Sequence, residues 1–251
     1  MNKKEKNKRK QIQTLPKHFS VEKFFGPTFG IFKLPDDVVE ALTIMTNTII
    51  NDPLSESYGK NLAGAIKQEK FLYKEDFVNA GVSQILENCI KSYIVTSAKK
   101  HLAHLDKYRY ESMIIDAWVV SQYENEYNPI HNHTACDISA VLYLKTPNVK
   151  GRRGIDEKRN DDDGDINFVY RSNDRDLDIL EKGIWGFTPE VGDLFIFPSY
   201  LLHTVYPFLG NEERRSLAFN AIYRVLDGNE ILYGPFGSRS PKNYKYLESR
   251  P

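Results

Sequence analysis

The segment YNPIHNHTACDISAVLYL, residues 127–144, places two histidines one residue apart directly before a run of alternating apolar residues. The alternation over 138–144 predicts a β-strand with one buried face. In an extended segment, residues i and i+2 project to the same side, so His131 and His133 can converge on one point. Because the whole chain contains only six histidines, this pair marks a candidate metal site.

Four further segments have the composition of β-strands. Each is short, rich in β-branched and aromatic residues, and bounded by Gly, Asn, Asp or Pro. Five such segments with few helix signals between them indicate a mainly β fold, either a sandwich or a barrel. The four are SMIIDAWVVSQY (112–123), GDINFVYRS (164–172), GDLFIFPS (192–199) and RRSLAFNAIYRV (214–225).

Two helices are predicted before the strands begin. The first spans 34–52, with Asp36 as its cap, and the second spans 80–102. Apolar residues that we expect to face the core recur at helical spacing, at Val38, Leu42, Met45 and Ile49 in the first helix and at Val82, Leu86, Ile90 and Tyr93 in the second.

The chain divides into parts of different composition. Residues 1–15 form a basic tail, which we expect to be disordered, and 16–111 form a helical support region. The β core spans 112–226 and contains a charged inserted loop at 148–164. Residues 227–251 form a C-terminal arm in which apolar residues do not recur at a regular spacing.

The overall composition argues against several classes of protein. The 34 basic residues balance 34 acidic ones, so a dedicated nucleic-acid binder is not expected, apart from weak contacts of the basic tail with RNA or another polyanion. No apolar run reaches membrane-spanning length, and no apolar stretch of a secretory signal follows the basic N-terminus. Two cysteines, Cys89 and Cys136, give no disulfide framework, so a reducing, cytoplasmic setting is expected.

A third histidine and an arginine follow in the C-terminal half of the β core. His203 lies in GDLFIFPSYLLHTVYP, after a predicted strand that ends at Pro198. A close histidine pair with one distant histidine suits a metal site, and imidazole binds iron, zinc, copper and nickel. Arg214 comes eleven residues later and shares a strand face with Ser216 and Asn220. If that face points inward, the arginine offers a forked donor to a carboxylate held near the metal.

The ordered set of motifs resembles the iron(II)/2-oxoglutarate-dependent oxygenases, in particular the subfamily with a His-x-His motif before an SGVYYL-like strand and the prolyl-hydroxylase-like members. The resemblance implies a double-stranded β-helix, or jelly-roll, core with N-terminal helices packed on it. Asn125 stands where relatives often have glycine, and asparagine tolerates the left-handed backbone that such a turn requires. The matching segments are WVVSQYENEYNPIHNHTACDISAVLYLKTP (118–147) and VGDLFIFPSYLLHTVYPFLGNEERRSLAFN (191–220).

The resemblance also implies cofactors and the residues that bind them. Fe(II) would be bound by His131 and His203, with 2-oxoglutarate as co-substrate and O2 as oxidant. Arg214 would pair with the distal carboxylate of 2-oxoglutarate, beside Ser216 and with a hydrogen bond from Tyr143. The expected catalytic residues are therefore His131, His203 and Arg214.

The third iron ligand is open, because most of the superfamily has His-x-Asp or His-x-Glu where this chain has His131-x-His133. The spacing favours His133 as the third ligand of an all-histidine set. Asp137 could instead supply a carboxylate from the following strand, or water could complete the shell. We expect Asp137 to support the ligands or to cap the strand.

The expected function is hydroxylation of an unactivated C–H bond, coupled to decarboxylation of 2-oxoglutarate to succinate. A protein side chain such as proline is the candidate substrate, with Tyr127 and Asn220 as candidate substrate contacts. Two alternatives stay open: a cupin-like metalloenzyme that does not use 2-oxoglutarate, and a non-catalytic jelly-roll binding module. Formation of succinate distinguishes the first alternative, and metal analysis of the purified protein distinguishes the second.

Overall fold

The structure is a computed structural model that describes residues 18–22, 26–101, 108–148, 163–170, 183–234 and 247–249. The predictions for the basic tail, for most of the inserted loop and for most of the C-terminal arm fall outside these described residues.

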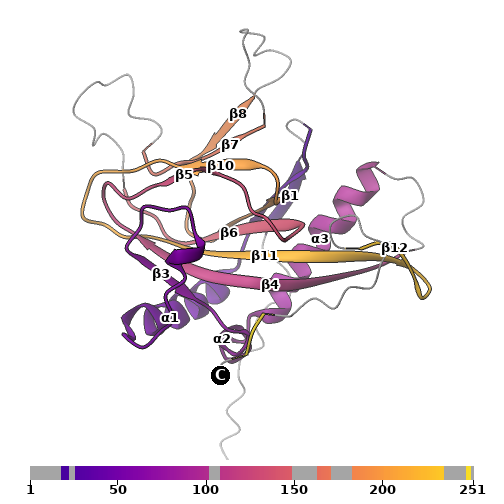
Figure 1. Ribbon diagram of the computed structural model, residues 1–251, viewed down its shortest axis with the longest axis horizontal. Coiled ribbons are helices and arrows are strands. Elements are labelled where there is room, and N and C mark those ends of the chain that lie inside the picture. Colours follow the sequence, from indigo (N-terminus) through magenta and orange to yellow (C-terminus); the bar gives the residue numbers. More distant parts are fainter. Residues whose placement is uncertain are drawn as a thin grey trace, which may run out of the picture.

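Antiparallel strands form two sheets, the smaller lying above the larger in Figure 1. All five predicted strand segments are strands, and the mainly β fold class is confirmed. The larger sheet has the order β1 (His18–Glu22), β2 (Phe29–Lys33), β9 (Asp193–Pro198), β6 (Ile138–Lys145), β11 (Arg214–Asp227), β4 (Arg109–Gln122) and β3 (Gln68–Phe71), with β12 (Glu230–Tyr233) paired to β11. The smaller sheet has the order β5 (Asn128–His131), β10 (Leu202–Val205), β7 (Ile166–Val169) and β8 (Ile184–Phe187).

Strand β11 shows how the sequence divides the two faces of the larger sheet. Leu217 and Phe219 are fully buried in the core that the sheet shares with the helices. Ser216 and Asn220, which alternate with them, line a cavity on the other face. A shift of one residue in strand register would exchange these faces, so the apolar alternation fixes the polar side chains in the cavity.

Three helices cover the face of the larger sheet that points away from the smaller sheet (Figure 1). They are α1 (Asp36–Asn51), α2 (Lys74–Ala80) and α3 (Ser83–His101), and a short 3-10 helix, η1 (Gly59–Asn61), precedes β3. The apolar positions predicted to face the core are buried, except Met45, which is partly buried. None of the described helices combines the length and the hydrophobicity that a membrane crossing requires.

The start of α1 corrects one prediction, because Asp36 is not the cap. Pro35 occupies the N-cap position with an extended backbone (φ −60°, ψ 148°). Asp36 and Asp37 lie in the first turn, where negative charge favours the helix N-terminus. The Oδ1 atom of Asp37 accepts a hydrogen bond from the backbone N of Val38 at 3.0 Å.

The region 16–111 also supplies elements that the sequence analysis missed. Helix α2 has seven residues, about two turns, which is too short for an apolar period to repeat. Strands β1, β2 and β3 have only four or five residues each, so alternation could not identify them. This region therefore extends the larger sheet at both edges as well as covering it.

Aromatic rings fill the space between the two sheets. We call Phe29, Phe168, Phe195 and Phe197 the aromatic cluster; Phe168 comes from the smaller sheet and the other three come from the larger one. The ring centroids of Phe168 lie 4.6 Å from Phe29 and 4.9 Å from Phe197. Phe197 also packs edge-on against His203, with centroids 5.0 Å apart. The aromatic cluster thus sets the separation of the sheets beside the histidines.

Candidate active site

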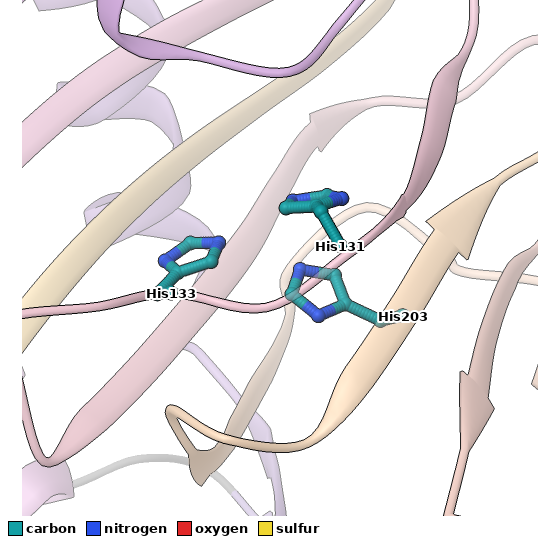
Figure 2. Close-up of side chains that lie close together, drawn as sticks. All are labelled: His131, His133 and His203. Atoms are coloured by element: carbon teal, nitrogen blue, oxygen red, sulfur yellow. The ribbon is translucent and has the colours of Figure 1, made fainter.

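Three histidines meet where the smaller sheet faces the larger one, and Figure 2 shows their rings grouped together. His131 ends β5 and His203 lies in β10, and the two residues are register partners across these strands. His133 follows in the next loop, where its backbone N donates a hydrogen bond to the carbonyl oxygen of Ser199 at 2.9 Å. One ring nitrogen from each histidine lies within 4.8 Å of the others. The structure therefore brings together the three histidines that the sequence analysis selected.

Each histidine uses its Nδ1 atom in a hydrogen bond within the protein. In His131 and His203, Nδ1 lies 2.7 and 3.0 Å from the backbone carbonyl oxygen two residues earlier. In His133, Nδ1 lies 2.7 Å from Oδ1 of Asn220. Because these oxygens only accept hydrogen bonds, each Nδ1 carries the proton and each Nε2 keeps a free lone pair.

Asn220 lies behind His133 and is itself held in place. The Ser139 hydroxyl donates a hydrogen bond to Oδ1 of Asn220 at 3.0 Å, which keeps that oxygen directed toward the ring. Asn220 also lines the cavity, where the sequence analysis expected it to contact substrate. Its amide oxygen therefore already has two donors before any ligand enters.

Burial keeps the three imidazoles neutral. Desolvation lowers the pKa of His131, and it lowers the pKa of His133 to about 4, with a smaller contribution from the charge of His131. The pKa of His203 lies well below its ordinary value because of burial and the two neighbouring histidines. Neutral imidazole is the form that binds a metal, so the group is ready to act as a set of ligands at neutral pH.

The donor set fits a divalent transition metal. Three nitrogen ligands with their second nitrogens oriented by acceptors match the usual support of histidine–metal sites. Among the described residues, the group contains no carboxylate. Asp137 lines a second cavity, and its Oδ2 accepts a hydrogen bond from the backbone N of Tyr223 at 3.3 Å.

Arg214, at the start of β11, lines the same cavity of about 330 Å³ as the histidines. Only 1% of the residue is exposed. Nη1 donates to Oε1 of Gln122 and Nη2 to the hydroxyl of Tyr143, both at 3.0 Å, and the guanidinium lies 4.8 Å from the centre of the Tyr143 ring. It forms no ion pair with a described residue, although the charge of Asp165 acts on it, and its Nε has no hydrogen-bond partner in that part of the chain. A buried cation with an unused donor fits an anion supplied by a ligand.

The remaining predicted site residues occupy different places. Ser216 lines the cavity one alternation along β11 from Arg214. Tyr143 is fully buried and contacts Arg214 through its hydroxyl. Tyr127 is 44% exposed, and its carbonyl oxygen pairs with the backbone N of Ala65. It is not among the described residues that line the cavity.

Several polar residues at the cavity were missed by the sequence analysis, among them Gln122 and Glu69. Gln122 is the register partner of Arg214 on β4 and fixes one arm of its guanidinium. Glu69 comes from β3 and lines the cavity. Only the pairing of distant strands reveals either residue, and no sequence motif around them indicates it.

The turn before the histidines agrees with the prediction for Asn125. Its φ of +65° lies in the left-handed region that asparagine tolerates better than most residues. The backbone N of Asn125 donates to the carbonyl oxygen of Phe208 at 3.0 Å, which ties this turn to the segment after β10.

Comparison with known families identifies the class of protein. Residues 116–220 match the family described as "Putative 2OG-Fe(II) oxygenase". This segment includes the three histidines and Arg214, so the resemblance seen in the sequence is confirmed. The chain is thus an enzyme of the 2-oxoglutarate-dependent oxygenase class, whose cofactors are Fe(II), 2-oxoglutarate and O2.

Solved structures are similar to this chain at low sequence identity. The non-heme α-ketoglutarate-dependent carbocyclase SnoK from nogalamycin biosynthesis is 9% identical, with 80% of this chain and 83% of that chain covered and a TM-score of 0.51. A 2OG-Fe(II) oxygenase family oxidoreductase from Burkholderia pseudomallei is 14% identical, with coverage of 76% and 83% and a TM-score of 0.48. A Pseudomonas putida prolyl-4-hydroxylase is 16% identical, with coverage of 80% and 91% and a TM-score of 0.45. No curated protein sequence matches the chain significantly.

Proposed function

We propose that the protein hydroxylates an unactivated C–H bond, with iron(II) held by His131, His133 and His203 and with 2-oxoglutarate anchored on Arg214. One observation carries this proposal: three neutral imidazoles with free Nε2 atoms share a cavity with a buried guanidinium that forms no ion pair with any described residue. The imidazoles suit the metal and the guanidinium suits a carboxylate, so the two groups fit the two ends of a metal-chelating dicarboxylate.

When bound, iron(II), 2-oxoglutarate and O2 would supply the oxidation, in which one oxygen atom would enter the substrate as a hydroxyl and the other would enter succinate with release of CO2. The chain contributes orientation and the exclusion of water. The Nδ1 hydrogen bonds fix the plane and tautomer of each ring. The aromatic cluster packs behind His203 and keeps that side of the site dry.

Tyr143 is proposed to bind the same carboxylate as Arg214. Its hydroxyl oxygen accepts a hydrogen bond from Nη2 of Arg214, so the hydroxyl hydrogen is available to donate. Ser216 lines the cavity next to them and offers a second neutral donor. The distal carboxylate would thus be held by one cation and two hydroxyls.

A protein side chain such as proline is the proposed substrate. Its support is the combination of Tyr143 with the Arg214-x-Ser216 pattern, which resembles the prolyl-hydroxylase-like members of the class. The direct assay is incubation with a proline-containing peptide, Fe(II) and 2-oxoglutarate in air, followed by mass spectrometry. Gain of one oxygen atom on proline is expected; succinate formation stimulated by other peptides but not by this one would reject proline.

The visible spectrum tests the iron and 2-oxoglutarate sites directly. Anaerobic protein with Fe(II) and 2-oxoglutarate should show the weak charge-transfer band of the chelate, and the band should fade as succinate forms in air. His203→Ala should lose the band and the succinate. His18→Ala, at a described strand residue outside the cavity, should keep both. A fully active His203→Ala protein would reject the proposed metal site.

A further inference from the structure

The reaction proposed above leaves Glu69 without a role, although this residue lines the cavity. Glu69 pairs with Val120 of β4 in the sheet, and Val120 pairs with Ser216 of β11. All three line the cavity, so they form one row across the sheet on the face of the histidines. Strand register therefore places the Glu69 side chain on the cavity face of the sheet.

The carboxylate of Glu69 is buried, and one of its two oxygens has no partner among the described residues. Only 3% of the residue is exposed, and Oε1 has no hydrogen-bond donor among the described residues. Gly59 and Gly64 flank it closely: a Cβ atom at Gly59 would lie 3.1 Å from Oε2, and one at Gly64 would lie 3.1 Å from Oε1. Because both positions are glycine, no side chain there crowds the carboxylate oxygens of Glu69.

Two basic side chains near Glu69 donate hydrogen bonds to other groups. The guanidinium of Arg214 bonds to Gln122 and Tyr143, and the Lys70 ammonium donates to the carbonyl oxygen of Ser55 at 2.8 Å. Burial, with the charge of Glu126 as a second cause, raises the pKa of Glu69 to about 7. A cation that entered the cavity and paired with this carboxylate would offset the cost of burying its negative charge.

The wall beside Glu69 also suits a cation. Tyr58 and Trp118 line the cavity and stack on each other, with ring centroids 5.4 Å apart. Asp116 supplies a second carboxylate to the lining, and it forms a side-chain hydrogen bond with Tyr58. Aromatic faces next to carboxylates attract ammonium and guanidinium groups.

This wall reaches the histidines. The ring centroid of Trp118 lies 5.6 Å from that of His133. Strand spacing places the Cα atom of Glu69 roughly 8 Å from that of Trp118, on the neighbouring strand and one alternation along. Glu69, Trp118 and the three histidines line one cavity, so a group bound at Glu69 would share that cavity with the metal site.

From this arrangement we infer that the substrate carries an ammonium or guanidinium group, which Glu69 binds as its counter-ion against the Tyr58–Trp118 wall. This inference rests on the proposed function, since it concerns the substrate of that site. Opposite charges then separate the two ligands of the cavity: the dicarboxylate goes to Arg214 and the cationic substrate goes to Glu69. A basic side chain, of lysine or arginine type, is the simplest group of this class, and in a protein substrate it would accompany the proline proposed above.

Binding of matched small probes tests the inference. The probes are the Nα-acetyl N-methylamides of lysine, arginine and norleucine, the last being a neutral analogue of lysine. They are titrated by calorimetry into the full chain loaded with Fe(II) and 2-oxoglutarate under nitrogen. At least one cationic probe should bind tenfold or more tightly than norleucine, and the lysine and arginine arms separate ammonium from guanidinium.

Glu69→Gln, which keeps the shape of the side chain, should lose this preference. Glu111→Gln on β4, an exposed acid in a surface ion pair with Arg109, is the matched control and should keep it. Equal binding of charged and neutral probes by the wild type would overturn the inference, even if the variant did not fold. A preference that survives in Glu69→Gln would overturn the role of Glu69.

The same samples separate this inference from the proposed function. A normal Fe(II)–2-oxoglutarate band without cation preference rejects the cationic substrate alone. Cation preference that depends on Glu69 in protein that forms no band rejects the proposed iron and 2-oxoglutarate sites and leaves the cation site standing.

Discussion

Replacing Arg214 by methionine should remove 2-oxoglutarate binding without removing the fold. In the protein without ligand, burial of the unpaired guanidinium costs several kcal/mol. Its bonds to Gln122 and Tyr143 offset about 1.5–3 kcal/mol each. Since these contributions nearly cancel, we expect Arg214→Met to change the free energy of unfolding by no more than about 2 kcal/mol in the absence of 2-oxoglutarate.

The response to 2-oxoglutarate should differ much more. At a concentration of 100 times Kd, the ligand stabilises the wild type by about 2.7 kcal/mol. Loss of the charged, forked contact costs about 3–4 kcal/mol of binding, a factor of roughly 100–1,000 in Kd. At the same ligand concentration, the variant should then gain less than about 0.5 kcal/mol.

Denaturant unfolding of metal-loaded protein under nitrogen, with and without 2-oxoglutarate, measures both quantities. Arg109→Met, which removes an exposed arginine on β4, is the control and should keep the full protection by ligand. If 2-oxoglutarate protects Arg214→Met as strongly as the wild type, Arg214 does not bind the co-substrate. Loss of more than about 4 kcal/mol without ligand would make Arg214 a structural residue instead.

Two further predictions concern Asn220 and Glu69. Asn220→Ala should remove the hydrogen bond to Nδ1 of His133 and weaken metal binding by about 10- to 100-fold in a metal titration. Ser139→Ala, which removes only the neighbouring hydroxyl, should weaken metal binding less. Equal losses in the two variants would show that Asn220 does not orient His133. For Glu69, the pKa is raised in the folded state to about 7, so the folded protein holds a proton that the unfolded chain releases above about pH 4.5. Its contribution to stability therefore falls as the pH rises through this window, and Glu69→Gln should gain about 2 kcal/mol relative to the wild type between about pH 5 and pH 8. If the free energies of unfolding of Glu69→Gln and the wild type differ by the same amount at about pH 5 and about pH 8, the raised pKa of Glu69 is contradicted.

The sequence alone was enough to predict those elements and residues that a periodic apolar pattern or a short motif determines. Alternation identified β4, β6, β9 and β11, and on β11 it assigned Arg214, Ser216 and Asn220 to one face. The i, i+2 relation brought His131 and His133 together without knowledge of the fold. These features are local, so a single sequence contains them.

The rest depended on pairing between distant segments. His131 meets His203 because β5 and β10 are register partners, and no spacing in the chain encodes that register. Glu69 enters the cavity on a four-residue strand whose sequence, QEKF, gives no strand signal. Asp137 precedes β6, which begins at Ile138, so alternation along that strand could not place its side chain.

The aromatic cluster determines how long a ligand can be and still reach from the histidines to Arg214. His131 and His203 belong to the smaller sheet, Arg214 belongs to the larger one, and the rings of Phe29, Phe168 and Phe197 hold the sheets apart. Face-to-face sheets lie about 10 Å apart, while one methylene adds only about 1.3 Å to a dicarboxylate chain. Close-packed interiors transmit such small changes, so trimming one ring could shift the preferred co-substrate toward a shorter diacid without altering any residue that touches it. The packing of these aromatic residues, which contact no co-substrate, would then determine which diacid the protein prefers.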